Sequence, residues 1–148
     1  MAANEAIPLG DAFYIAAPIA ANGGIGPNSG DPLIWGVANS PSVSIALNTE
    51  TSYTPPGSLV ATGNISVKRV GAFFYSVAAK TSINPGSGKA INPGDPVYMD
   101  GGTIDTTTGI LYGGTLNANS STGWIFGHAM DAIASGQTAT IRVLIGCK

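Results

Sequence analysis

The sequence predicts an all-β fold, a compact β-barrel or β-sandwich with an extended N-terminal arm and little or no helix. Gly and Pro, 21 and 10 of the 148 residues, interrupt the chain throughout. The short apolar runs between these turn signals are rich in β-branched and aromatic residues, which is typical of strands. A chain of this length can bury a sizeable core without a disulfide or a metal. We therefore expect an arm over residues 1–10 and a single β domain over residues 11–148.

The predicted strands follow one another between the turn signals. They are 12–17, 33–38, 43–47, 64–68, 71–79, 97–99, 103–105, 110–112, 124–129 and 137–145. Residues 103–112 predict a hairpin in which Gly109 takes a positive φ. The run 71–79 is almost continuously apolar and predicts a strand buried on both faces. In 137–145 apolar and polar residues alternate, which predicts one buried face.

Two other segments break this pattern. Residues 48–58 predict a long exposed loop, because Pro55 and Pro56 have no N–H to donate to a sheet. A single helical turn is conceivable near residues 130–135, where Asp131 can act as its N-cap.

The tripeptide Gly-Asp-Pro occurs twice, at residues 30–32 and 94–96. In the second copy Pro93 and Gly94 suit the two central positions of a type II turn. Pro96 favours an extended Asp95 and opens the following strand, and the Asp95 carboxylate can accept N–H bonds inside the loop. We interpret both copies as structural turns, formed by Gly30, Asp31, Pro32, Pro93, Gly94, Asp95 and Pro96.

A cation site is the alternative use of these acids. It would combine Asp95 with Asp100 and Asp105, but their spacing matches neither an EF-hand nor a calcium-binding repeat. We therefore expect no metal and no cofactor.

Residues suited to catalysis are few. His128 is the only histidine and lies within a predicted strand, and Cys147 is the only cysteine and stands one residue from the end. A Cys–His nucleophile pair is formally possible. Glu5 and Glu50 fall in the arm and the exposed loop, which disfavours a paired-carboxylate site. The glycine-rich segment 23–30 lacks the lysine of a phosphate-binding P-loop. The sequence predicts that the protein is not an enzyme.

Charge is unusually sparse. Asp, Glu, Lys and Arg make up 9% of the residues, against about 25% in an average protein. A surface with so few charges tends to associate, so we expect other protein to cover much of it. The six Lys and Arg residues are scattered, which excludes a nucleic-acid-binding stripe. No apolar run is long enough to span a membrane, and the first residues do not resemble a secretory signal.

The aromatic residues allow two interpretations. Trp35, Trp124, Tyr53 and Tyr112 can stack on sugars, as in a small carbohydrate-binding domain. The competing interpretation is structural and is favoured, because the aromatic residues occur within apolar runs. It assigns Trp35, Phe73, Phe74, Trp124 and Phe126 to the core.

The order of short motifs resembles the capsid decoration, or cement, proteins of tailed bacteriophages. The start NEAIPLGDAF is followed by a first lobe that ends in WGVA, then by GAFFYSVAA, INPGDPVYMD and a G-x-A segment at Gly127 and Ala129. The closing strand reads ASGQTATIRVLI. The resemblance extends from about Ile7 to Ile145, and residues 39–62 depart from it.

This resemblance implies a non-enzymatic virion protein, made in the host cytoplasm, on the outer surface of the capsid. Its expected partners are the major capsid protein and two further copies of itself, in a trimer at or near three-fold positions. We further hypothesise that the arm residues Glu5, Ala6, Ile7, Pro8 and Leu9 pair with an exposed strand edge on a neighbour or on the shell. The alternative function is a carbohydrate-binding β-domain of a receptor-binding or adhesin protein. A third possibility is a small hydrolase that brings His128 to an acid.

Overall fold

The fold is that of a computed structural model, and it is all-β as the sequence predicts. The structure describes residues 5–8, 12–16, 27, 30–35, 42–46, 64–81, 87–105, 109–121 and 123–146. Within these ranges the chain forms twelve strands and no helix.

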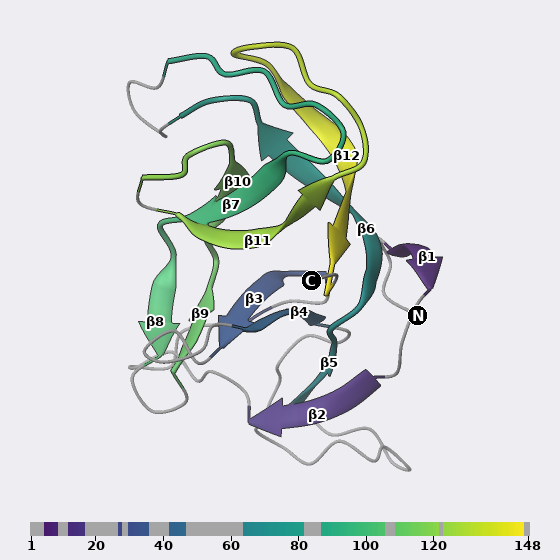
Figure 1. Cartoon of the computed structure of the whole chain (residues 1–148). Helices are drawn as coiled ribbons and strands as arrows, with labels where there is room; N and C mark the ends of the chain where they lie inside the picture. The colour runs from purple at the N-terminus through teal and green to yellow at the C-terminus, as the bar shows by residue number, and fades with distance from the viewer. Residues whose placement is uncertain are drawn as a thin grey trace.

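Five strands close into a barrel (Figure 1). They are β6 (Gly71–Ala78), β7 (Pro96–Asp100), β10 (Thr115–Asn117), β11 (Trp124–Ala129) and β12 (Thr138–Ile145). Their order is β6-β10-β7-β11-β12, and β12 returns to β6 in an antiparallel pairing of eight residues. The β10–β6 contact is parallel, and the other barrel pairings are antiparallel. Closure leaves only part of one β6 edge unpaired within the barrel, because β10 pairs with just the last two residues of β6.

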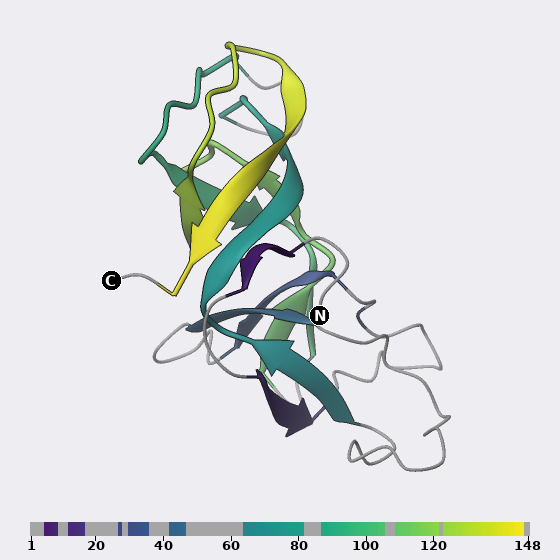
Figure 2. The same ribbon diagram turned by 90° about the vertical axis from the view of Figure 1, so that its right-hand side faces the viewer.

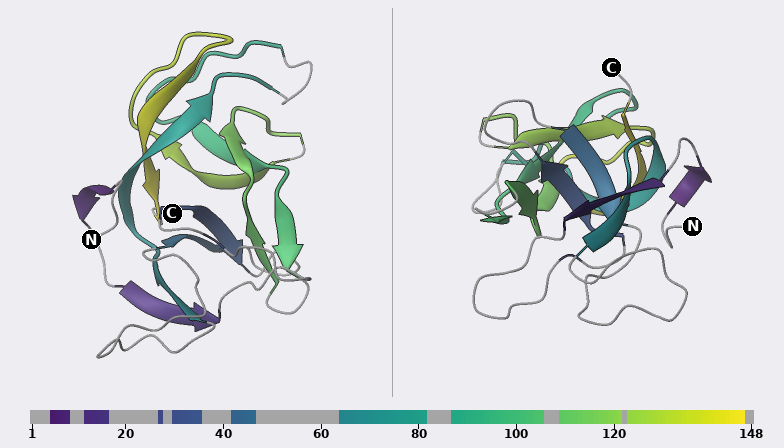
Figure 3. Two further views of the ribbon diagram at one scale, coloured as in Figure 1. Left: turned by 180° about the vertical axis from the view of Figure 1, so that it is seen from behind. Right: turned by 90° about the horizontal axis from the view of Figure 1, so that it is seen from below.

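The other sheet is antiparallel and covers one end of the barrel (Figures 1 and 3). Its order is β2-β5-β4-β3-β9-β8. The bounds are β2 (Ala12–Ala16), β3 (Pro32–Trp35), β4 (Ser42–Ala46), β5 (Asn64–Lys68), β8 (Thr103–Asp105) and β9 (Ile110–Tyr112).

One hydrophobic core joins the two sheets. Ile34, Ile45 and Leu111 of the second sheet are buried in the same cluster as Phe73 and Phe126 of the barrel. The opposite face of the second sheet carries a separate buried cluster made by Leu33, Ala46, Val67, Ile110 and Tyr112. Successive side chains of a strand point to opposite sides of the sheet. Alternate residues of the second sheet therefore contribute to the two clusters, and both faces of this sheet carry buried side chains.

The chain crosses directly from one sheet to the other at three connections between consecutive strands. β5 runs into β6 (Figure 2), β7 into β8 through Gly101 and Gly102, and β9 into β10 through Gly113 and Gly114. Because β7 pairs with β10 and β8 with β9, the four strands from β7 to β10 form one long bent hairpin. At the bend a Cβ on Gly102 would lie 2.6 Å from the carbonyl oxygen of Tyr112, so only glycine fits there.

The N-terminal strand β1 (Glu5–Pro8) includes four of the five predicted arm residues, and Leu9 lies outside the described residues. β1 pairs antiparallel with the start of β6, where Glu5 stands opposite Phe73 and Pro8 opposite Gly71. β10 covers only the end of β6. β1 thus occupies a stretch of the β6 edge that the barrel leaves open.

Most predicted strands are confirmed, and the 103–112 hairpin forms with Gly109 at a φ of 69°. Two expectations are wrong. β6 is not buried on both faces, since Phe74 is 46% exposed and Ser76 is also exposed. A strand of a closed barrel has an outer face, which explains the difference. No helical turn forms at residues 130–135, where Ile133 instead makes a bridge to Ile91.

Candidate functional site

The loop around Asp95 is a turn, as predicted. The Asp95 N–H donates to the Asn92 carbonyl at 3.0 Å, and Gly94 between them has a φ of 93°. The Asp95 carboxylate accepts the Asn92 backbone N–H at 2.8 Å. Pro93 and Gly94 therefore occupy the centre of a type II turn, and the acid holds the loop from within.

The same turn continues into a G1 bulge in the sheet. The Gly94 N–H donates to the Ala129 carbonyl at 2.8 Å, and the Ala129 N–H donates to the Asp95 carbonyl at 2.9 Å. Gly94 and Asp95 thus stand opposite the single residue Ala129, and Gly94, the first of the two, has a positive φ. Pro96 then begins β7.

The first Gly-Asp-Pro copy repeats this hydrogen-bonding pattern. The Gly30 N–H donates to the Ala46 carbonyl at 2.8 Å, and the Ala46 N–H donates to the Asp31 carbonyl at 3.1 Å. Gly30 has a φ of 95°, and Pro32 begins β3. The repeated tripeptide is therefore a bulge that starts one strand in each sheet. The sequence predicts a turn at both copies and does not predict the bulge.

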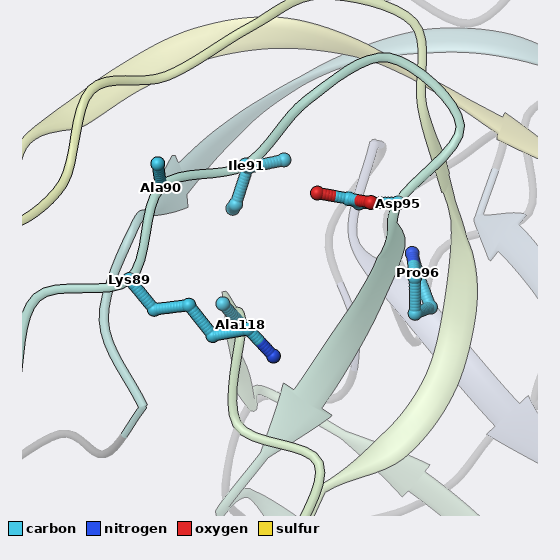
Figure 4. A pocket seen from close by; sticks show the side chains of 6 residues that line it. All are labelled: Lys89, Ala90, Ile91, Asp95, Pro96 and Ala118. Atoms are coloured by element: carbon cyan, nitrogen blue, oxygen red, sulfur yellow. The ribbon is translucent and has the colours of Figure 1, made fainter.

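The depression beside Asp95 is too small for a ligand pocket. It encloses about 80 Å³ and is lined by Lys89, Ala90, Ile91, Asp95, Pro96 and Ala118. Figure 4 shows the Asp95 carboxylate pointing toward Ile91 and the Lys89 side chain running past Ala118. Pockets for small molecules usually enclose about 300–1,000 Å³.

A larger cavity of about 360 Å³ lies between the barrel wall and the first Gly-Asp-Pro bulge. Its lining consists of Gly30, Asp31, Pro32, Tyr75, Ser76, Ala78, Gly114, Thr115, Leu116 and Thr138. These residues include no histidine, cysteine, lysine or arginine. The lining therefore contains no nucleophile and base pair of the Cys–His kind.

The three acids of the cation alternative do not come together. Asp95 and Asp100 stand at opposite ends of the β7 segment, about 16 Å apart at 3.3 Å per residue. The Asp100 carboxylate accepts the Asn119 side-chain N–H at 2.7 Å. Among the described residues no group of three His, Cys, Asp or Glu side chains is placed to hold a metal ion.

A polar cluster after β10 was not predicted from the sequence. Asn119 is buried, and its Oδ1 accepts the backbone N–H and the hydroxyl of Ser121 at 3.1 and 2.6 Å. Asn117 is also buried and accepts the Asn119 N–H at 2.8 Å. The composition of NANSST is a signal for such a loop, because Asn and Ser side chains bond to nearby backbone groups.

The remaining catalytic candidates are dispersed. His128 is half-buried on β11, opposite Leu144 on one side and Pro96 on the other. Glu5 belongs to β1, while Glu50, Cys147 and all of the segment 23–30 except residues 27 and 30 fall outside the described residues.

The aromatic side chains do not form a stacking groove within the described residues. Trp35 is half-buried on β3 with the Arg69 guanidinium 5.4 Å from its ring centre, and Tyr112 is buried. Trp124 lies on β11, in the other sheet, and Tyr53 falls outside the described residues. The core assignment is correct for Phe73 and Phe126 and wrong for Phe74 and Trp124, which are exposed.

Three of the four exposed large apolar side chains among the described residues lie on β8 and β11. Ile104 is 51% exposed, Trp124 36% and Ile125 56%. Trp124 pairs with Met99 near the end of β7, which leads directly into β8, and Figure 1 shows β8 beside the start of β11. Trp124 stands opposite the buried Met99 and Ile125 opposite Tyr98, so these two side chains point to opposite faces of β11.

The pairing of the second sheet explains the exposure of Ile104. Ile104 stands opposite Leu111, Leu111 opposite Ile34, and Ile34 opposite Val43. Residues directly opposite each other in antiparallel strands share a face. Leu111 and Ile34 are buried in the core shared with the barrel, whereas Ile104 extends beyond it at the sheet's end.

An ion pair joins the last barrel strand to the preceding loop. The Asp131 carboxylate accepts the Arg142 backbone N–H at 2.9 Å and the Arg142 Nε–H at 3.0 Å, and also contacts Nη2. The side-chain hydrogen bonds from Arg142 lower the pKa of Asp131 to about 2 from an ordinary 3.8. The Asp131 side chain thus fastens the loop instead of capping a helix.

Comparisons with protein-family models, with curated proteins and with solved structures find no match to this chain. Among the described residues no helix is long and apolar enough to cross a membrane.

Proposed function

We propose that this protein is a non-enzymatic structural component of a virion. It decorates the outer surface of a phage capsid and stabilises the shell, as a trimer at three-fold positions. The observation that carries the proposal is the surface. A chain with only 9% charged residues exposes large apolar side chains on β11 and on β8, the terminal strand of its sheet among the described strands.

Such a surface is suited to permanent contacts with protein. Large apolar side chains left exposed favour association with other protein. A terminal strand also offers backbone hydrogen-bonding groups to a partner. A lattice protein satisfies both requirements when its neighbours are in place.

The use of the acids is consistent with a structural role. Asp95 holds a turn and Asp131 fastens a loop to β12. Asp100 holds the Asn119 side chain. Each of these three carboxylates therefore stabilises a loop or turn of the fold.

The N-terminal strand supplies the contact to the shell in this proposal. β1 is the terminal strand of its sheet among the described strands, with β6 on one side. A strand of the major capsid protein adds to its other side by β-augmentation. The arm hypothesis is thereby refined, since β1 bridges the chain's own barrel and the shell.

Co-sedimentation with capsid shells tests the proposal. The purified protein is mixed with undecorated, expanded shells assembled from the major capsid protein encoded in the same genome. We expect saturable binding and a higher melting temperature of the shells. No binding to such shells, or the lack of a capsid gene in that genome, would contradict the proposal.

A further inference from the structure

We propose that the cavity of about 360 Å³ between the barrel wall and the first Gly-Asp-Pro bulge binds a neutral, polyhydroxylated small molecule such as a single sugar unit. The described lining includes none of the four aromatic residues that the sequence offers for stacking on sugars. The inference goes beyond the proposed function and does not depend on it, because a protein can stabilise a shell without binding any small molecule.

The cavity lies at an opening in the barrel wall, where β6 and β10 diverge. The two strands pair only at the last two residues of each. Tyr75 and Leu116 line the cavity and belong to the core, whereas their neighbours Ser76 and Thr115 line it and are exposed. Because successive side chains of a strand point to opposite faces, a space that touches both kinds lies at the facing edges of the two strands.

The first Gly-Asp-Pro bulge forms a further side of the cavity, through Gly30, Asp31 and Pro32. Two backbone hydrogen bonds to Ala46 hold this bulge, at 2.8 and 3.1 Å. The walls are therefore parts of paired strands and of a hydrogen-bonded bulge. Such a site is formed before a ligand arrives, which lowers the entropy that binding costs.

The size of the cavity suits a small molecule. About 360 Å³ falls within the range of roughly 300–1,000 Å³ that is usual for such pockets. The depression beside Asp95 encloses only about 80 Å³ and falls below that range.

The charge of the lining disfavours an ionic ligand. Asp31 is the only charged residue of the described lining, so an anion would find no cation there. Asp31 already takes part in another interaction, which disfavours an organic cation that needs this carboxylate as its counter-ion. A calcium ion takes six to eight oxygen ligands, and no group of three acids, histidines or cysteines among the described residues is placed to hold a metal.

Hydroxyl groups make up most of the polar side chains in the lining. Ser76, Thr115 and Thr138 come from β6, β10 and β12. Each hydroxyl can donate one hydrogen bond and accept two, and the Thr115 hydroxyl donates to the Asp100 carbonyl at 3.4 Å, which leaves its lone pairs to accept. Sugar hydroxyls also donate and accept, so they can bond to each of these groups.

The remaining side chains of the lining are apolar or aromatic. They are Pro32, Tyr75, Ala78 and Leu116, and they can pack against the C–H groups of a sugar ring. Small-molecule pockets usually combine apolar walls with a few polar groups that fix the orientation of the ligand. A hydrocarbon would suit this lining less well, because it would remove water from the hydroxyls without replacing the hydrogen bonds.

A titration followed by the backbone amide signals in NMR spectra tests the inference. The full-length protein is titrated separately with glucose, galactose, mannose and N-acetylglucosamine. Thr138→Trp places a bulky side chain at the cavity. Thr140→Trp is the matched control, because Thr140 is exposed on the same face of β12 and lies outside the described lining. Circular dichroism identifies folded variants, and Ser76→Trp replaces Thr138→Trp if the latter does not fold.

We expect at least one sugar to shift the amide signals of Ser76, Thr115 and Thr138 in a saturable manner. The dissociation constant should be about millimolar, since a monosaccharide has few atoms with which to bind. Thr138→Trp should weaken binding by about tenfold or more, because its indole overfills the site, and Thr140→Trp should match the original protein.

A sugar acid adds a test of the charge argument. Glucuronate has the glucose ring with a carboxylate, and it should bind more weakly than glucose because the described lining offers no cation. The inference would be overturned by the absence of a saturable shift with all four neutral sugars, by shifts confined to residues outside the cavity, or by unaltered binding to folded Thr138→Trp. Glucuronate that binds more tightly than every neutral sugar would also overturn it.

Discussion

Gly94 and Gly102 have nearly the same backbone conformation in different surroundings. Their φ angles are 93° and 92°, but a Cβ on Gly94 meets no atom within 4 Å, whereas one on Gly102 would meet backbone atoms at 2.6 and 2.9 Å. We expect Gly94→Ala to cost about 1–2 kcal/mol for the left-handed conformation alone. Gly102→Ala should cost roughly 1–3 kcal/mol more, because the added atom overpacks the bend.

Guanidinium unfolding of the two alanine variants measures this difference. Each serves as the control for the other, since the backbone penalty is the same. Equal losses would show that the bend between the sheets widens to admit a methyl group, contrary to the close packing that we describe.

The Asp131–Arg142 ion pair predicts a stability change at low pH. The pKa of Asp131 is lowered in the folded protein to about 2 from 3.8. Its stabilising contribution is therefore fully present above pH 3.8 and is lost as pH falls toward 2. We expect Asp131→Asn to lower the melting temperature at pH 6, with the difference from the original protein shrinking between pH 4 and 2.

Thermal melts of both proteins across that range make the measurement. The same substitution in an Arg142→Gln background is the control, where the difference at pH 6 should be smaller. A difference that stays constant from pH 6 to 2 would argue against a charge-dependent contact.

At the residue scale, local signals predict local structure and little else. Pro93-Gly94 specifies its turn because proline and glycine fix the two φ angles that the turn needs. The Asp131–Arg142 pair was not predicted, because it depends on how β12 packs against the preceding loop. Phe74 and Trp124 were assigned to the core because apolar character alone does not distinguish the inner from the outer face of a barrel wall.

At the scale of elements, the strands with strong alternation were predicted closely and β10 was missed. β10 is only three residues long, and Leu116 is its one apolar residue. It is a strand because it lies between β6 and β7 and closes the barrel. Its strand conformation is therefore set by tertiary contacts with its neighbours and not by the local propensity of its residues.

The arm gives a prediction for an element. Residues 2–10 can be deleted without opening the barrel, because β10 and β12 close it and β1 only extends the sheet. We expect the truncated protein to keep its β-sheet circular dichroism and to melt a few degrees lower, with its binding to undecorated shells lost.

Shell co-sedimentation and a thermal melt of the truncated protein check this expectation. The full-length protein is the control in both. Undiminished shell binding would reject β1 as the contact, and loss of the folded signal would show that β1 is needed for the barrel itself.

At the scale of the whole molecule, the arrangement of the sheets could not be obtained from the sequence. The barrel closes by pairing β6 with β12, whose partners are 60 to 74 positions apart in the chain, and by a parallel contact of β6 with β10. The second sheet then covers the barrel's end with Ile34 and Leu111. Composition predicted the fold class, but these pairings depend on register between distant strands.

The composition of the whole chain is the basis for assembly. With 9% charged residues and a net charge of −2, the surface is weakly solvated. The exposed side chains of Ile104, Trp124 and Ile125 add apolar area that association would bury. We therefore expect the protein to be an oligomer in solution before it meets a shell.

The solution mass of the purified protein, measured by light scattering over a dilution series, tests the central claim most directly. One chain has a mass of 14.8 kDa. We predict a particle of three times that mass that persists on dilution, because association buries apolar surface that a chain with few charges leaves exposed. A particle with the mass of one chain at every concentration would contradict the account.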